Sequence, residues 1–364
     1  MRIYLGLANF CNLSCKYCYR HFYPSHNTLS HTCLNFGAIN KLINLLEESC
    51  IQEKIHVILH GNDPLVVGFE YLKELFSLFA RSKLSFSYNL QTNLVALNED
   101  MIQLFDKYNV SIGTSLDGPQ SIHDAVRIFK NGKGSFKIVM EKINLLRKHK
   151  INTSVICVVT KRSIGKESSI YNFFKSLELD FSISPIICMN GCCSEELALK
   201  SWEYAGFFNE IAEIYLYDTN LKNHILTIDG YIKKILFSTN KKPGYCYDDI
   251  LFIDQDASLY RCGRFAGSPE FCIGNLYDIK DFSRIFLNPQ NIRYEMKVQN
   301  LVTQCIDCDI FEFCGGGCLH SAITNNTIPF DEFTCNYTKQ IIPALINTVH
   351  QSMKARPSFI AAFS

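Results

Sequence analysis

The sequence lacks an excess of charge of either sign. Its 36 lysines and arginines balance 35 aspartates and glutamates, so the 364-residue chain has a net charge of +1. The one basic cluster, at 147–150, ends a predicted helix, where cations complement the helix dipole. We therefore expect neither a nucleic-acid partner nor a membrane partner bound through bulk charge.

The sequence also lacks long hydrophobic runs. No apolar stretch approaches bilayer length, and residues 1–7 resemble a strand rather than a signal peptide. We therefore expect a cytoplasmic protein. In such a reducing compartment, the 17 cysteines favour metal sites over a disulfide framework.

Strands and amphipathic helices alternate in the first half of the chain. The helical pattern is clearest at 34–46 and 136–146, where apolar residues recur every three or four positions. Six strand–helix units in series predict a parallel sheet with right-handed crossovers, that is, an α/β fold with a partial (β/α)6 TIM-like barrel. The predicted strands lie near 2–8, 55–60, 84–91, 110–115, 151–159 and 181–187.

The second half has a different character, which predicts three domains. Residues 1–190 form the barrel, 191–244 a helical bridge and linker, and 245–364 a cysteine-rich domain that begins with a small hairpin around a turn at 255–257.

A first cysteine set follows the first strand. Cys11, Cys15 and Cys18 have C-x3-C-x2-C spacing on one tight loop. Three thiolates can hold three irons of a cubane cluster and leave the fourth iron open. The alternative is structural zinc, with His21 as the fourth ligand.

This loop resembles the signature of the radical S-adenosylmethionine (SAM) superfamily, including the aromatic Tyr17 before the last cysteine. The resemblance implies that Tyr17 lies beside the adenine of SAM. It continues at later strand ends, although residues 61–64 and 117–119 are also good turns and the alternative for Arg127 is a surface residue. By resemblance, the SAM contacts come from Tyr17, Gly61, Asn62, Asp63, Pro64, Asn93, Ser115, Asp117 and Arg127.

Three of these contacts have a more definite implied role. Relatives carry Gly-Gly-Glu-Pro where this chain has Gly61-Asn-Asp-Pro64, and that segment holds the methionine amino group. Asp63 keeps the carboxylate but is one methylene shorter, so we expect the loop to sit closer or to use a water. Ser115 would contact the ribose, and Arg127 the methionine carboxylate.

A second cysteine set occupies the C-terminal third, with the spacing C-x15-C, then C-x2-C-x5-C-x3-C, then C. It resembles the seven-cysteine SPASM domain of peptide-modifying radical enzymes; two zinc ribbons are the alternative. Ala257 replaces a glycine that the family has five residues before the second cysteine. The glycines at 315–317 let the backbone approach a cluster. The set consists of Cys246, Cys262, Cys305, Cys308, Cys314, Cys318 and Cys335.

The resemblance also implies a ligand assignment. Cys305, Cys308, Cys314 and Cys335 would hold a distal auxiliary cluster. Cys246, Cys262 and Cys318 would hold a nearer one, which is one ligand short. We take Cys188, Cys192, Cys193 and Cys272 as ordinary thiols by default, with a role for 188–193 left open.

These cofactors imply an oxidative radical reaction. Three [4Fe-4S] clusters and SAM would generate a 5′-deoxyadenosyl radical, remove a hydrogen from the substrate and pass an electron outward. An external one-electron donor such as flavodoxin or ferredoxin is expected. The sequence contains no distinct signal for a general base. Asp248 and Asp249 are candidates for that role, and the simpler interpretation is that both are solvated loop acids.

The resemblance includes two kinds of peptide-modifying enzyme. Anaerobic sulfatase-maturing enzymes form formylglycine and use an Asp after the second auxiliary cysteine as base, but this chain has Gly263 there. Maturases of ribosomally made peptides (RiPPs) cross-link side chains, and we favour them, with a carbon–carbon cyclophane over a thioether. We expect a precursor peptide as partner, recognised directly or through a separate leader-binding protein, because the chain begins at strand one. The alternative of another class is a non-catalytic iron–sulfur electron carrier or zinc scaffold.

Overall fold

The fold is α/β, and the six expected strand–helix units are present. The structure is a computed structural model that describes all residues except 23–29, 50–53, 187–193, 238–249, 329 and 356–364. It divides into two compact units, each built from separate stretches of the chain. Unit 1 consists of 1–114, 127–153 and 246–297, and unit 2 of 115–126, 154–245 and 298–364. The three-domain division stays a prediction.

Unit 1 contains a sheet whose central strand is the first one. The strand order is β4-β3-β2-β1-β7-β8-β9. The first five strands in this order are parallel to their neighbours, and β8 and β9 are antiparallel. The strands are β1 Arg2–Gly6, β2 Ile55–His60, β3 Phe86–Thr92, β4 Ser111–Ser115, β7 Ile250–Ile253, β8 Ser258–Tyr260 and β9 Gly274–Asn275.

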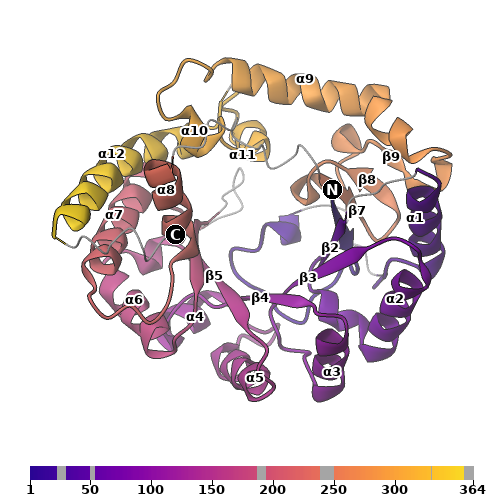
Figure 1. Cartoon of the computed structure of the whole chain (residues 1–364), viewed down its shortest axis with the longest axis horizontal. Coiled ribbons are helices and arrows are strands. Elements are labelled where there is room, and N and C mark those ends of the chain that lie inside the picture. Colours follow the sequence, from indigo (N-terminus) through magenta and orange to yellow (C-terminus); the bar gives the residue numbers. More distant parts are fainter. Residues whose placement is uncertain (23–29, 50–53, 187–193, 238–249, 329, 356–364) are drawn as a thin grey trace. The chain divides into compact units, whose positions relative to one another are not determined.

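Helices cover one side of this sheet. Figure 1 shows α1, α2 and α3 along the outer side of β2 and β3. Asn35 and Asn98 cap α1 and α3, because their side chains accept hydrogen bonds from Ala38 N and Met101 N. The α-helices of unit 1 are α1 Phe36–Glu48, α2 Phe69–Arg81, α3 Glu99–Lys107, α5 Phe136–Lys148 and most of α9 Pro289–Thr303. Its 3-10 helices are η1 Tyr19–Phe22, η3 Pro64–Val67, η5 Gly263–Phe265, η6 Pro269–Phe271, η7 Leu276–Asp278 and η8 Phe282–Leu287.

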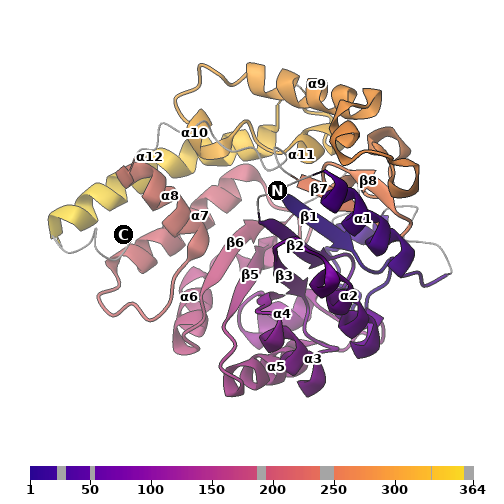
Figure 2. The same ribbon diagram turned by 45° about the vertical axis from the view of Figure 1, so that its right-hand side comes forward.

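Unit 2 combines two parallel strands with long helices. β5 (Thr153–Val159) pairs with β6 (Phe181–Pro185), and α12 (Glu332–Ala355) lies along α7 (Ser201–Tyr217), as Figure 2 shows. No helix in the described part of the chain is long and apolar enough to cross a bilayer. The remaining elements are α4 Gln120–Val126, η4 Lys161–Ser163, α6 Glu167–Ser176, α8 Leu226–Phe237, α10 Phe311–Cys314 and α11 Leu319–Thr324.

The expected hairpin is confirmed, and its turn explains a sequence departure. Asp254 N donates to Ser258 O at 2.9 Å, and Ala257 N donates to Asp254 O at 2.9 Å, which closes the turn between β7 and β8. Ala257 has a φ of 66°, in the left-handed region that costs a residue with a Cβ about 1–2 kcal/mol. This is the position where the family has glycine.

Replacing Ala257 with glycine is therefore expected to be nearly neutral. Glycine removes the strain of a Cβ in the left-handed region, which stabilises the fold. It also loses a buried methyl group and makes the unfolded chain more flexible, which destabilises the fold. These effects offset one another and leave a change of about 0.5 kcal/mol or less in the free energy of unfolding. Ala266 is also fully buried but has a φ of −54°, so Ala266→Gly gains no such relief and should lose about 1.5 kcal/mol. Urea unfolding of both variants checks this; equal losses would contradict it.

Candidate functional site

The strand ends of unit 1 bring the first cysteine loop together with two later loops. β1, β2 and β3 are parallel, so their carboxyl ends meet at one edge of the sheet. The cysteine loop follows β1, residues 61–64 follow β2, and Asn93 follows β3. The sequence motifs therefore converge at the edge where a barrel enzyme carries its site.

The three cysteines of this loop lie within electrostatic range of one another. Burial, together with the nearby Asp63, Cys15 and Cys18, raises the pKa of the Cys11 thiol to about 12, against the hydrogen bond from Leu13 N, which lowers it. The Cys11 sulfur accepts hydrogen bonds from Leu13 N and Asn93 Nδ2, both at 3.4 Å. A group that binds this thiol must displace its proton, as iron does when it binds a thiolate.

Asn93 joins the end of β3 to the cysteine loop. Its Nδ2 donates to Asn12 Oδ1 at 2.7 Å as well as to the Cys11 sulfur, and its Oδ1 accepts from Val95 N at 2.9 Å. Sequence reasoning assigned Asn93 to SAM. In the structure the amide of Asn93 contacts the first cysteine, a contact that no sequence pattern indicated.

Asp63 lies beneath this contact and is 1% exposed. Its carboxylate accepts from Leu65 N at 3.0 Å, from Thr92 Oγ1 at 3.0 Å, and from Asn93 N at 2.7 Å. Burial raises its pKa to about 6, and these hydrogen bonds oppose the rise. The shorter side chain of Asp, compared with the family's Glu, thus serves to fasten the loop after β2 to the end of β3.

Gly61 and Asn62 hold the same loop against the end of β1. Gly61 has a φ of 122°, and a Cβ there would meet Ala8 O at 2.9 Å. Asn62 Nδ2 donates to Asn9 O at 2.6 Å, while the buried Asn62 Oδ1 has no hydrogen-bond partner in the described part of the chain. Pro64 begins η3. A buried acceptor without a donor fits a ligand that brings an N–H group.

Tyr17 and Arg127 are brought together although 110 positions of sequence separate them. The Arg127 guanidinium lies 5.2 Å from the centroid of the Tyr17 ring, and Arg127 is 7% exposed. Ser14 N donates to Ile128 O at 2.7 Å, which ties the cysteine loop to the segment after Arg127. This arrangement places a cation beside an aromatic ring on the cysteine loop.

Ser115 and Asp117 follow β4. Ser115 is the last residue of the strand and is half-buried. Asp117 is fully buried in unit 2, where its Oδ1 accepts from Val158 N at 3.0 Å and its N–H donates to His123 Nδ1 at 3.3 Å. The carboxylate of Asp117 therefore joins the end of β4 to β5.

The distal cysteine set is also grouped, within unit 2. Burial raises the pKa of Cys305, and Cys314, Cys335 and Cys308 raise it further, in that order. Burial likewise raises the pKa of Cys314, while a hydrogen bond from Gly316 N lowers it. The glycines at 315–317 all have positive φ, from 60° to 84°, a conformation that glycine adopts without strain. Their approach to a cluster stays a prediction.

Asp331 organises this region, and sequence reasoning did not single it out. It is 1% exposed, and its carboxylate accepts from Cys318 N at 3.1 Å, Ser321 Oγ at 2.9 Å and Thr334 N at 3.2 Å. A Cβ on Gly317 would meet Asp331 Cβ at 2.6 Å. An aspartate immediately before a helical pattern is an N-cap signal, and α12 does begin at the next residue.

Cys262 lies in unit 1, at the end of the hairpin, and its neighbour Gly263 is tightly enclosed. A Cβ on Gly263 would meet Cδ2 and Cε2 of Phe252 at 2.6 Å. Cys272 donates its thiol to Gly274 O at 3.3 Å. Cys246, Cys188, Cys192, Cys193, Asp248 and Asp249 lie outside the described residues, as does the side chain of His21.

The cysteine groups of the described chain can hold iron–sulfur clusters, because thiolates are the ligands of such clusters. Within the described ranges, no three His, Cys, Asp or Glu side chains are arranged as the ligands of one metal ion. The cysteines are nevertheless grouped, three in unit 1 and four in unit 2. Thiolate-only groups are the ligand sets of cubane clusters.

Comparisons with known proteins identify this architecture. The model of the Radical SAM superfamily matches residues 6–167. This part of the chain is a radical SAM domain. Such a domain binds a [4Fe-4S] cluster and SAM, and the cysteine-rich C-terminus fits a SPASM domain.

Relatives match beyond the radical SAM domain. A cysteine-type anaerobic sulfatase-maturating enzyme of Clostridium novyi is 26% identical, covering 91% of this chain and 92% of its own. A serine-type anaerobic sulfatase-maturating enzyme of Bacteroides thetaiotaomicron is 27% identical, covering 85% and 80%.

Solved structures share the fold. Native anSMEcpe with bound AdoMet and Kp18Cys peptide has a TM-score of 0.81 at 21% identity, covering 96% of this chain and 100% of its own. Streptococcus suis SuiB bound to the precursor peptide SuiA has a TM-score of 0.64 at 14% identity, covering 88% and 72%. Both bind peptides, but at these identities the likeness shows the fold alone.

The contact between Asn93 and Cys11 predicts an effect on the first cluster. N–H donors to a cysteine sulfur favour the more negative, reduced cluster. Asn93→Ala should therefore lower its reduction potential by on the order of 40 mV, the equivalent of about 1 kcal/mol for one electron. EPR-monitored redox titration measures this, with the signal assigned by its loss in Cys15→Ala. Asn89→Ala, an exposed position on β3, is the control and should leave the potential unchanged.

The enclosed carboxylate of Asp63 predicts that the family's glutamate does not fit here. Asp63→Glu adds a methylene to a filled site and should lower the free energy of unfolding by about 1–3 kcal/mol. Asp106→Glu on the exposed face of α3 should change it by about 0.5 kcal/mol or less. Urea denaturation compares the two. A stable Asp63→Glu variant that binds SAM more tightly would contradict the assignment.

Proposed function

We propose that this radical SAM enzyme oxidatively cross-links side chains of a ribosomally made peptide. Carbon–carbon cyclophane formation is favoured over a thioether. The proposal rests on the grouped cysteines and on the enclosure of Gly263, the observation that separates it from formylglycine formation. Its cofactors would be three [4Fe-4S] clusters and SAM, with an external one-electron donor such as flavodoxin or ferredoxin.

The cysteine groups suggest how the clusters would be held. Cys11, Cys15 and Cys18 would hold the first cluster, with one iron left for SAM. Cys305, Cys308, Cys314 and Cys335 would hold the distal auxiliary cluster, and Cys246, Cys262 and Cys318 the nearer one. When bound, the first cluster and SAM would supply the chemistry that removes a hydrogen atom from an unactivated carbon. The auxiliary clusters would supply a route for the surplus electron.

The residues of the chain itself would bind and orient SAM. The buried Asn62 Oδ1 has no donor among the described residues. It would accept a hydrogen bond from the methionine ammonium group. Arg127 would pair with the methionine carboxylate, and Tyr17 would lie against the adenine. Asp63 and Asn93 would act indirectly, because their hydrogen bonds fix the loops that carry these groups.

The enclosure of Gly263 argues against the base that sulfatase-maturing enzymes place there. Because the Phe252 ring lies 2.6 Å from where a Cβ would be, an aspartate at 263 requires Phe252 to move. Formylglycine formation is the second candidate. The two sequence relatives named above are sulfatase-maturating enzymes, and their similarity extends over most of this chain. Under either proposal the substrate is a polypeptide side chain.

Anaerobic coexpression with short peptides encoded beside the gene tests the proposal. The expected product has lost two hydrogen atoms by mass spectrometry, and Cys15→Ala abolishes the loss. Cys33→Ala removes a half-buried cysteine outside the predicted ligand sets and should leave the product unchanged. Reaction of the peptide's cysteines with an alkylating agent then separates a carbon–carbon bond from a thioether.

The opposite result also has a defined meaning. If SAM is cleaved but every neighbouring peptide keeps its mass, cross-linking of those peptides is wrong. A sulfatase-derived peptide that then gains an aldehyde would establish formylglycine formation instead. Iron content of roughly twelve atoms per chain, expected for three cubanes, would exclude a zinc scaffold.

A further inference from the structure

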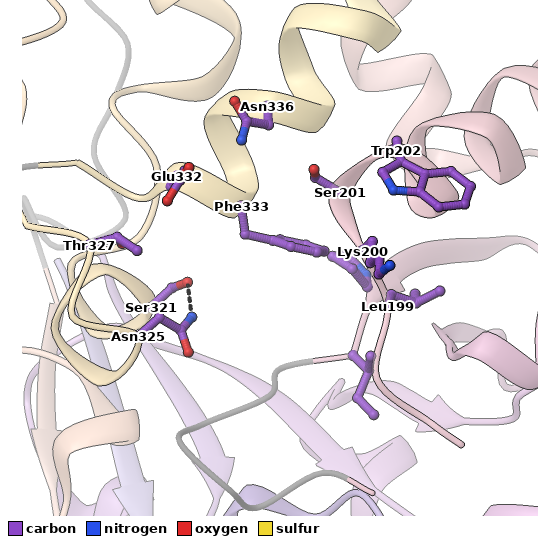
Figure 3. A pocket seen from close by; sticks show the side chains of 12 residues that line it. Leu199, Lys200, Ser201, Trp202, Ser321, Asn325, Thr327, Glu332, Phe333 and Asn336 are labelled. Carbon is purple, nitrogen blue, oxygen red and sulfur yellow. Dashed lines mark hydrogen bonds between the residues drawn. The ribbon is translucent and has the colours of Figure 1, made fainter. Parts of the chain in front are cut away.

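Unit 2 contains a pocket that the radical SAM motifs do not explain. Its volume is about 510 Å³, within the range of pockets that bury a ligand of several residues or a small molecule. It opens where β6 ends at Pro185, and the first turns of α7 and α12 form two of its sides (Figure 3). All of its lining residues belong to unit 2.

One wall of the pocket is apolar and aromatic. Ile186 and Leu199 are among its lining residues, and the Phe333 side chain extends from α12 toward Leu199 and Lys200 (Figure 3). Trp202 stands at the rim and is 58% exposed. A large indole held in water at the edge of a cavity is the kind of side chain that becomes covered when a partner binds.

The opposite wall carries neutral hydrogen-bonding groups. Asn325 Nδ2 donates to Ser321 Oγ at 3.3 Å, the contact dashed in Figure 3. Among the described residues, the buried Thr327 Oγ1 has no hydrogen-bond partner, and Asn336 is exposed at the start of α12. Amide and hydroxyl groups of this kind pair with the N–H and C=O groups of a peptide backbone.

The charges of the pocket favour a neutral polypeptide over an ionic ligand. Lys200 and Glu332 are its two charged residues, and their signs are opposite. The Lys200 ammonium group lies 5.9 Å from the Trp202 ring centroid, so part of its charge already faces an aromatic ring. A single carboxylate is a poor site for a divalent cation, which needs several oxygen ligands.

The position of the pocket agrees with this chemistry. Pro185 is the last residue of the parallel strand β6, so the pocket lies at the carboxyl end of that strand. Phe333 is two residues before Cys335, and Ser321 is three residues after Cys318. A bound peptide would therefore contact α11 and the first turn of α12, close in sequence to Cys318 and Cys335.

We propose that this pocket binds an aromatic side chain of the substrate polypeptide. The ring of the bound residue packs against Phe333 and Trp202, and its backbone bonds to the amide and hydroxyl wall. The inference rests on the proposed function for its substrate class, and it extends that function by naming a specificity pocket.

Trp202 provides a direct measurement, because it is the single tryptophan of the chain. Its emission is followed while the holoenzyme is titrated with N-acetyl-Ala-Phe-Ala-amide or N-acetyl-Ala-Ala-Ala-amide. The phenylalanine probe should change the emission saturably, and the alanine probe should not. Phe333→Ala should raise the half-saturating concentration about tenfold, whereas Leu226→Ala, an exposed position on α8 outside the pocket, should not.

The coexpressed peptide provides the second readout. Phe333→Ala and Asn336→Ala should each raise its KM severalfold with kcat unchanged, since uniform binding is lost. Asn336 is exposed, so this variant keeps the test valid if Phe333→Ala does not fold.

The two proposals fail in different ways. If the peptide is modified while Trp202 emission and both KM values stay unchanged, the pocket proposal is wrong and the proposed function stands. If the phenylalanine probe binds saturably but no peptide is modified, the pocket binds polypeptide and the proposed function fails.

Discussion

The buried carboxylate of Asp63 is the constraint on which the candidate site depends. It follows β2, yet its hydrogen bonds go to the end of β3, and through Asn93 they continue to the sulfur of Cys11. Three loops that are far apart in sequence are thereby fixed by one side chain that is almost excluded from water. A buried polar network stabilises a fold when each of its members is hydrogen-bonded. Each oxygen of the Asp63 carboxylate accepts a hydrogen bond.

A second carboxylate has a comparable role in the cysteine-rich region. Asp331 accepts hydrogen bonds from the Cys318 backbone and from the first turn of α12, the helix that carries Cys335. The three left-handed glycines before Cys318 leave room for this contact, because a side chain at Gly317 would collide with Asp331. Both cysteine sets are thus held by aspartates that do not belong to the cysteine motifs.

The distinction between the two candidate reactions depends on one local packing contact. Similarity over most of the chain favours sulfatase maturation, whereas the Phe252 ring occupies the space that a catalytic side chain at position 263 would need. Sequence similarity over most of the chain indicates shared ancestry and a shared fold. The substrate is selected by a few positions, and the aromatic pocket at Trp202 and Phe333 is another such position.

The sequence by itself determined the strand–helix order, the cysteine spacing and the radical SAM signature, because apolar periodicity and ligand spacing are local properties. It also indicated that Ala257 occupies a position suited to glycine, which the left-handed backbone of the turn explains. Tertiary structure decided what spacing could not: β7 pairs with β1, Asn93 contacts Cys11, and Phe252 closes position 263. The first two contacts join residues dozens to hundreds of positions apart, and the third depends on side-chain packing in a hairpin, so only the folded chain brings these groups within hydrogen-bonding or packing distance.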